Sequence, residues 1–156
     1  YSNLGYNLKI TDIQAAIGLA QFGKLEGFIK KRRENFFILK NKLEDLNPYF
    51  ILPQASTGAN PSWFGFPITI RDNNKINRNN LIQFLDSQNI GTRLLFSGNI
   101  TKQPYMINQK YKISGNLKVS DKIMNDSFWV GVYPGLRKNN INHISNVLHK
   151  YIEKNT

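Results

Sequence analysis

The sequence predicts an α+β domain in which a long N-terminal helix precedes a small three-stranded antiparallel or mixed sheet covered by helices on one side. Apolar residues recur at helical spacing through the first third of the chain. Short runs of β-branched and aromatic residues then alternate with helical runs. With 156 residues, 40% of them hydrophobic, the chain is long enough for one domain with a buried core.

The long helix is predicted to follow a capping box at Thr11 and Gln14, whose side chains can satisfy each other's free backbone amides. Apolar residues then recur every three or four positions until Asn47-Pro48 ends the pattern. A helix of about 35 residues would be ~52 Å long, which exceeds what this domain can cover. We therefore expect it to bend near residues 23–27, or its small apolar half at residues 13–20 to pack on something outside this chain.

Three strands are predicted at residues 63–70, 90–96 and 128–133, with helices around residues 81–85, 120–125 and 140–154. Pro67 indicates that the first strand lies at an edge or carries a bulge. We divide the chain into a linking segment with the long helix, residues 1–47, and a small α+β domain, residues 48–156. The strand aromatics are expected in the core rather than stacked on a ligand: Trp63, Phe64, Phe66, Phe128 and Trp129.

The composition excludes several kinds of site within this segment. Cysteine is absent, so disulfides, thiolate catalysis and cysteine-ligated metals are excluded. The two histidines, His143 and His149, are too few for a histidine-rich metal site, and we expect them to interact with the C-terminal end of their helix. Glu44 and Asp45 are interpreted as surface charges. No catalytic residue and no metal ligand is therefore predicted here.

The chain shows no targeting or membrane signal. No apolar run approaches the ~20 residues that span a bilayer. The first residues have neither the basic start nor the apolar stretch of a signal peptide, and they lack an initiator methionine. We expect a cytoplasmic protein without a membrane partner, whose true N-terminus lies upstream.

The net charge of +11 raises the question of a polyanionic partner. The lysines are scattered, and the one dense run, Lys-Lys-Arg-Arg at residues 30–33, lies inside the predicted helix. This run has two open interpretations, a solvated basic face or a face that binds phosphate or nucleic acid. Net charge carries information about binding partners rather than about the fold. A basic charge without a dense exposed basic patch does not lead us to expect nucleic acid as the partner.

Four segments resemble a known family. Residues 5–18 (GYNLKITDIQAAIG) are similar to the segment that opens the small domain in the DegT/DnrJ/EryC1/StrS family of sugar enzymes. Residues 61–67, 91–99 and 124–136 resemble the branch of this family that contains CDP-4-keto-6-deoxy-D-glucose 3-dehydrase, used in making the dideoxysugars of lipopolysaccharide. The resemblance implies the small domain of the type I aminotransferase fold, with the large cofactor-binding domain absent from this chain.

The resemblance also implies roles for particular residues. Asn7 would contact the cofactor phosphate of the neighbouring subunit, and Lys9 would lie near the same phosphate or the sugar nucleotide, without the bidentate fork of an arginine. Arg93 would hold the sugar or phosphate oxygens of the substrate, and Asn99 and Gln103 are further substrate-binding candidates. The residues alone leave other interpretations open: Asn7 in a turn, Lys9 solvated, and Arg93 as an edge-strand charge.

The family's chemistry implies pyridoxal or pyridoxamine phosphate (PLP or PMP) in the full-length protein, which supplies an electron sink. Its catalytic base is a histidine in the dehydrases and a lysine in the aminotransferases, and belongs to the large domain, so this segment alone is not expected to hold the cofactor. A homodimer, a CDP-sugar substrate and a reductase partner are implied as well. Any iron–sulfur cluster would need cysteines from elsewhere. The alternatives are a sugar aminotransferase, a stand-alone basic module for RNA or another polyanion, and a degenerate or truncated gene product.

Overall fold

The computed structural model describes Tyr6, residues 8–72 and residues 75–156. Its α-helices are α1 (Asp12–Phe22), α2 (Leu25–Lys42), α3 (Arg78–Ser87), α4 (Lys118–Asp126) and α5 (Lys138–Asn155). Its strands are β1 (Phe50–Ile51), β2 (Gly65–Ile70), β3 (Thr92–Leu94) and β4 (Ser127–Gly131). Short 3-10 helices occur at η1 (Glu44–Leu46), η2 (Ile100–Lys102) and η3 (Pro104–Met106). The predicted α+β class is confirmed.

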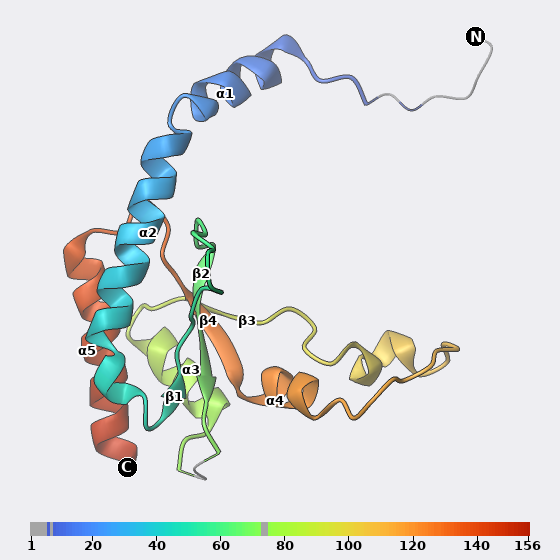
Figure 1. Cartoon of the computed structure of the whole chain (residues 1–156), viewed down its shortest axis with the longest axis vertical. Helices are drawn as coiled ribbons and strands as arrows, with labels where there is room; N and C mark the ends of the chain where they lie inside the picture. The colour runs from blue at the N-terminus through green and yellow to red at the C-terminus, as the bar shows by residue number, and fades with distance from the viewer. Residues whose placement is uncertain (1–5, 7, 73–74) are drawn as a thin grey trace.

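The predicted long helix divides at Gly23 into α1 and α2, as the expected bend near residues 23–27 requires. The capping box is present, with the Thr11 amide donating to Oε1 of Gln14 over 2.9 Å. None of the residues of α1 is buried, and Figure 1 shows this helix projecting away from the rest of the domain. The expected bend is therefore confirmed, whereas packing of the N-terminal half on something outside this chain stays a prediction.

The four strands form one antiparallel sheet in the order β1-β2-β4-β3. The three predicted strands are all present, and β1 was missed because two residues are too few to show a period of two. The edge position predicted for β2 is wrong, since β2 lies between β1 and β4. However, β1 reaches only Thr69 and Ile70. Among the described residues Pro67 pairs only with Trp129 of β4. On the side facing β1 it has no partner strand, so the amide hydrogen that proline lacks leaves no acceptor unsatisfied on that side.

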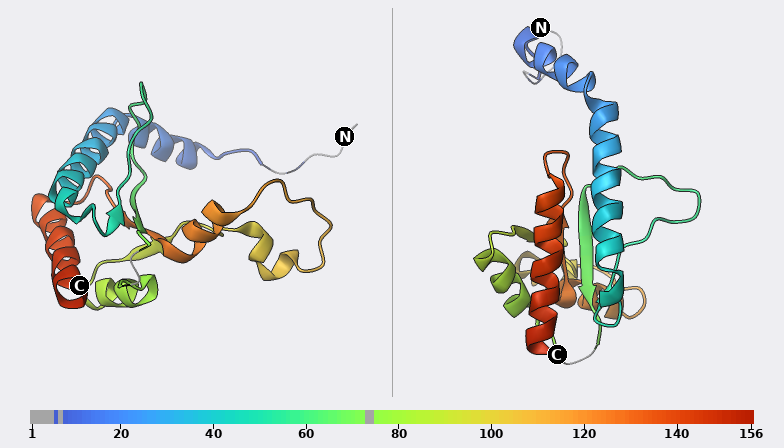
Figure 2. Two further views of the ribbon diagram at one scale, coloured as in Figure 1. Left: turned by 60° about the horizontal axis from the view of Figure 1, so that its bottom comes forward. Right: turned by 90° about the vertical axis from the view of Figure 1, so that its left-hand side faces the viewer.

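The core lies between one face of the sheet and the helices α2, α3 and α5. Along β2 every second side chain is buried, namely Phe66, Ile68 and Ile70. Helices α2 and α5 run side by side over this face, as both views of Figure 2 show. Within the part of the chain that the structure describes, no helix has both the length and the apolar composition to cross a bilayer.

A long arm, residues 95–117, connects β3 to α4 and carries η2 and η3. In Figure 1 this arm reaches away from α2 and α5, on the same side of the domain to which α1 extends. Helix α4 then returns the chain to the sheet and contacts β2 and β4. The arm is therefore joined to the domain through β3 at one end and α4 at the other.

Candidate binding site

An open hollow of about 710 Å³ lies beside β3 and β4, next to the start of β2. Trp129 points away from its buried neighbours Phe128 and Val130, because side chains alternate between the two faces of a strand. Aromatic and basic side chains dominate the hollow. Its lining comprises Arg32, Phe64, Arg93, Leu94, Phe96, Trp129, Gly131 and Tyr133.

The indole of Trp129 lies directly over Gly65. A Cβ atom built on Gly65 would stand 2.3 Å from Cε3 of Trp129, far inside any normal contact. Gly65 in turn pairs with Gly131 across the β2–β4 ladder. Neither β2 nor β4 therefore carries a side chain at this pair of positions beside the indole. Phe64 completes this side of the hollow, with its ring centroid 5.1 Å from that of Trp129. The two glycines thus make room for a flat aromatic surface.

Arg93 brings a positive charge to this aromatic surface. It lies opposite Trp129 in the β3–β4 register, and its side chain is exposed. Among the described residues its guanidinium makes no hydrogen bond or ion pair. The other cation of the lining, Arg32, instead donates to the carbonyl oxygens of Trp63 (3.1 Å) and Phe64 (3.3 Å). Since the lining includes no carboxylate, Arg93 is available to a bound anion such as a phosphate.

The two arginines of the run at residues 30–33 do not lie on a fully solvated face, and the structure leaves phosphate binding by this run untested. Arg32 holds the segment before β2 as described, and Nε of Arg33 donates to the Pro61 carbonyl over 3.3 Å. Both arginines are partly buried. The reason is tertiary, because the chain on residues 60–64 passes over α2 and presents its carbonyl oxygens to these two guanidinium groups.

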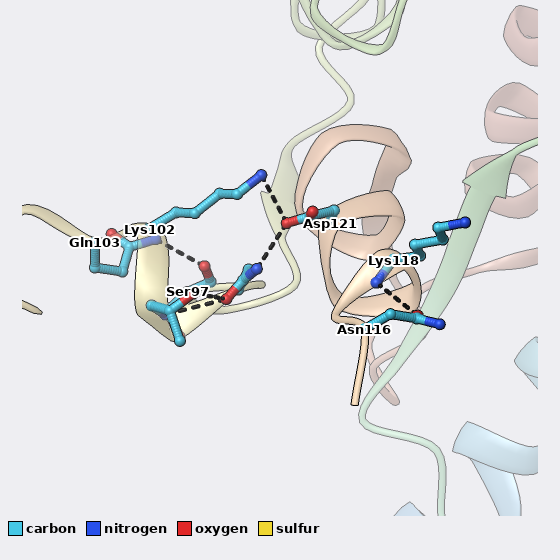
Figure 3. A network of polar contacts seen from close by, with 8 residues as sticks. Ser97, Lys102, Gln103, Asn116, Lys118 and Asp121 are labelled. Atoms are coloured by element: carbon cyan, nitrogen blue, oxygen red, sulfur yellow. Dashed lines mark hydrogen bonds and ion pairs between the residues drawn. The ribbon is translucent and has the colours of Figure 1, made fainter. Parts of the chain in front are cut away.

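Asn99 lies outside the lining of the hollow and is used within the fold. It is 3% exposed, and its Nδ2 donates to Oδ1 of Asp121 on α4 over 2.6 Å. Its Oδ1 accepts from the amide (3.1 Å) and the hydroxyl (2.7 Å) of Thr101. Lys102 adds an ion pair of 2.9 Å to the same carboxylate, as Figure 3 shows. The bonds from Asn99 and Lys102 lower the pKa of Asp121 and anchor the arm to α4.

The remaining candidates also lie away from the lining of the hollow. Nε2 of Gln103 donates to the Ser97 carbonyl over 2.7 Å, within the arm (Figure 3). Lys9 lies exposed on an irregular segment before α1. Asn7 falls outside the described residues. The structure therefore brings Arg93 alone, of the candidate residues that it describes, into the hollow, and the roles of the others stay predictions.

Sequence reasoning missed the aromatic part of the site. Phe66 and Phe128 are in the core as predicted, but Phe64 is 69% exposed, which contradicts its assignment to the core. Phe64 precedes β2, so the alternation of that strand does not govern it. Trp63 is half-buried and stacks on Phe36 with centroids 3.8 Å apart. The alternation around Trp129 was the one signal that could have placed its ring on the outer face.

The histidines and acidic residues make structural contacts. Nε2 of His149 lies 3.0 Å from a carboxylate oxygen of Asp45, and its Nδ1 lies 2.8 Å from the Ser145 carbonyl. Nε2 of His143 lies 2.8 Å from the Gln88 carbonyl. Asp45 is thus a partner of His149 rather than only a surface charge. Among the described residues, no group of three or more His, Asp or Glu side chains could hold a metal ion.

Almost the whole of this chain superposes on part of one enzyme of known structure. GDP-4-keto-6-deoxymannose-3-dehydratase with bound GDP-perosamine superposes with a TM-score of 0.83 at 28% identity, covering 94% of this chain and 37% of that chain. The same enzyme from Escherichia coli with bound hydrated PLP has a TM-score of 0.83 at 28% identity, covering 92% and 36%. The fold is therefore that of the small domain of type I PLP-dependent aminotransferases.

The chain belongs to the DegT/DnrJ/EryC1/StrS aminotransferase family, whose pattern it matches over residues 1–149. It is 47% identical over 155 residues to the lipopolysaccharide biosynthesis protein RfbH of Salmonella typhimurium, covering 99% of this chain and 36% of RfbH. It is 43% identical over 156 residues to the dTDP-4-dehydro-2,6-dideoxy-D-glucose 3-dehydratase of Saccharopolyspora spinosa, covering 100% and 34%. The chain thus spans about a third of the length of these relatives.

Proposed function

We propose that this chain is the C-terminal domain of a PLP- or PMP-dependent nucleotide-sugar 3-dehydratase that acts in making dideoxysugars for lipopolysaccharide. The observation that carries the proposal is the unpaired guanidinium of Arg93 in an aromatic hollow, because such a site suits the phosphate oxygens of a nucleotide sugar. The name of the Saccharopolyspora spinosa relative supports the same substrate class and reaction, and the name of RfbH supports a role in lipopolysaccharide biosynthesis. Our expected substrate is a CDP-sugar.

The residues described here do not by themselves form a cofactor site. Lys9 is exposed and makes no hydrogen bond or ion pair within the described residues. Its ammonium can add charge beside a phosphate, but it does not build a cradle. We therefore propose that Asn7 and Lys9 add contacts to a cofactor phosphate held by the large domain of a second subunit in a homodimer. The cofactor, when bound, supplies the electron sink of the reaction.

We further propose that the large domain covers α1. Large apolar side chains of this helix are exposed: Ile13, Ile17, Leu19 and Phe22. These positions lie on different sides of α1, and a helix that is apolar all round is normally buried against other parts of a protein. In this division residues 1–47 link the two domains and residues 48–156 form the small domain. We propose that the full-length protein is cytoplasmic. A reductase partner would complete the removal of oxygen from the sugar.

The test uses the full-length protein, with the coding sequence upstream of Tyr1 included. Purified protein is incubated with PMP, CDP-4-keto-6-deoxy-D-glucose and a reductant that stands in for the reductase partner, and the sugar product is followed by mass spectrometry. A product that has lost the C3 oxygen supports the dehydratase. An aminated sugar formed with glutamate would instead make the protein an aminotransferase, and a sugar left unchanged under both conditions would overturn the proposal.

One upstream position, at the cofactor-facing site of the large domain, sharpens this distinction. A histidine at this position supports dehydration, whereas a lysine there supports transamination.

The polyanion-binding alternative is weaker, because Arg32 and Arg33 both donate to backbone carbonyls. A stand-alone module of that kind would bind RNA with an affinity that falls steeply as salt rises.

A further inference from the structure

The first turn of the arm presents a bulky aromatic side chain in an unusual backbone conformation. Phe96 has a φ of +49°, in the left-handed region that bulky residues rarely adopt. Its side chain is nevertheless 84% exposed, so burial of the ring does not compensate for this conformation. Residues in such conformations persist where their surroundings hold them, and they are concentrated at ligand sites.

Contacts on both sides hold this turn in place. The amide of Phe96 donates to the Leu94 carbonyl over 2.8 Å. Two residues later Gly98 has a φ of +60°, and a Cβ atom there would stand 2.4 Å from Cβ of Met124 on α4. The turn therefore lies directly on α4, where Asn99 bonds to Asp121. The conformation of Phe96 is thus determined by the anchoring of the arm rather than by the packing of its own ring.

The ring belongs to the hollow that also contains Arg93. Among the described residues lining this hollow, Tyr133 is the only side chain of a type that commonly transfers protons, and aromatic rings and guanidinium groups make up most of the lining, which favours a binding role. The substrate part that fits it is consequently the one that does not react. In a nucleotide sugar that part is the nucleoside diphosphate, whose planar base suits aromatic rings and whose phosphates suit a guanidinium.

We propose that Phe96 stacks on the base of the nucleotide sugar, with Arg93 on its diphosphate, and that Gly98 and Asn99 are positioning residues that fix Phe96 there. This inference rests on the proposed function and deepens it. Base–aromatic stacking depends on a flat ring and accepts any base. An aromatic replacement at residue 96 should therefore keep the affinity, whereas removal of the ring should lower it for every ligand that contains the base.

The test measures Kd by calorimetry for CDP and CDP-glucose, with dTDP and GDP in parallel, using the full-length protein. Phe96→Gly should raise Kd for CDP and for CDP-glucose by the same factor, about ten- to hundredfold. Phe96→Trp should bind both within about threefold of wild type. Because glycine relieves the left-handed φ, Phe96→Gly should not lower Tm, which separates the loss of binding from misfolding. Phe37→Ala on α2 is the control for removing an exposed ring, and should leave Kd unchanged.

A double-mutant cycle tests the positioning role. Asn99→Ala should weaken CDP binding when Phe96 is present and have no further effect in Phe96→Gly. Equal Kd values for wild type and Phe96→Gly would overturn the inference while leaving the proposed function intact. A change confined to CDP-glucose would overturn it too, because the ring would then contact the sugar. A wild-type protein that binds none of CDP, dTDP, GDP and CDP-glucose would overturn both.

Discussion

Replacing Gly65 with alanine should destabilise the sheet beneath the hollow. The new Cβ would stand 2.3 Å from Cε3 and 2.9 Å from Cζ3 of Trp129, so either the indole or strand β2 must move. The indole is a rigid ring rather than the end of a flexible side chain, and the ring of Phe64 packs against it at a tilt of 52°. Overpacking of this kind costs about 1–3 kcal/mol. For a chain of this length, that loss corresponds to a Tm lower by roughly 2–12 °C.

The matched control is Gly91→Ala, because no atom lies within 4 Å of the Cβ position at Gly91. Its effect should stay within about 0.5 kcal/mol. Urea unfolding followed by tryptophan fluorescence measures both variants against wild type. In Gly65→Ala the emission of the folded protein should also change, since the indole is displaced. If the two variants unfold at the same urea concentration, the close packing of Trp129 on Gly65 is not the reason for the glycine.

The remaining predictions concern the anchor of the arm, the core and α1. The pKa of Asp121 is lowered in the folded protein, so its carboxylate stabilises the fold at neutral pH and this stabilisation is lost as the pH falls below about 4. Asp121→Asn should therefore flatten the acid limb of a plot of Tm against pH, and an unchanged limb would contradict the pairing. Leu148→Ala on α5, at a fully buried position, should cost about 2–5 kcal/mol in chemical unfolding. Ile17→Glu on α1 should leave the small domain within about 0.5 kcal/mol of wild type but lower the Tm of the full-length protein, because the charge lies on the proposed interface with the large domain.

Local pattern was enough to predict most of the secondary structure. The capping box at Thr11 and the small residues near Gly23 indicated where α1 begins and where the long helix divides. The strand aromatics Phe66 and Phe128 were correctly predicted in the core. These features depend on neighbours a few residues apart, so they can be read from the chain directly. The position of β2 inside the sheet could not, because β1 has only two residues.

The residues quoted for the family resemblance led to Arg93, and the fold brings this residue into the hollow. What surrounds Arg93 depends on contacts between distant parts of the chain. Asn99 looked like a ligand residue, yet it bonds to Asp121, 22 positions later. Arg32 looked like surface charge, yet it bonds to the carbonyl of Trp63, 31 positions later.

The sequence by itself therefore determined the fold class, the helices and most strands, because periodicity and capping are local, and its resemblance to the family pointed to Arg93 as a candidate binding residue. Only the tertiary structure decided which polar side chains are used inside the fold and which remain free for a ligand. A hydrogen bond needs its donor and acceptor within about 3 Å, and this distance is set by how the arm lies on α4 and how residues 60–64 cross α2. Arg93 is available because neither of those contacts reaches it.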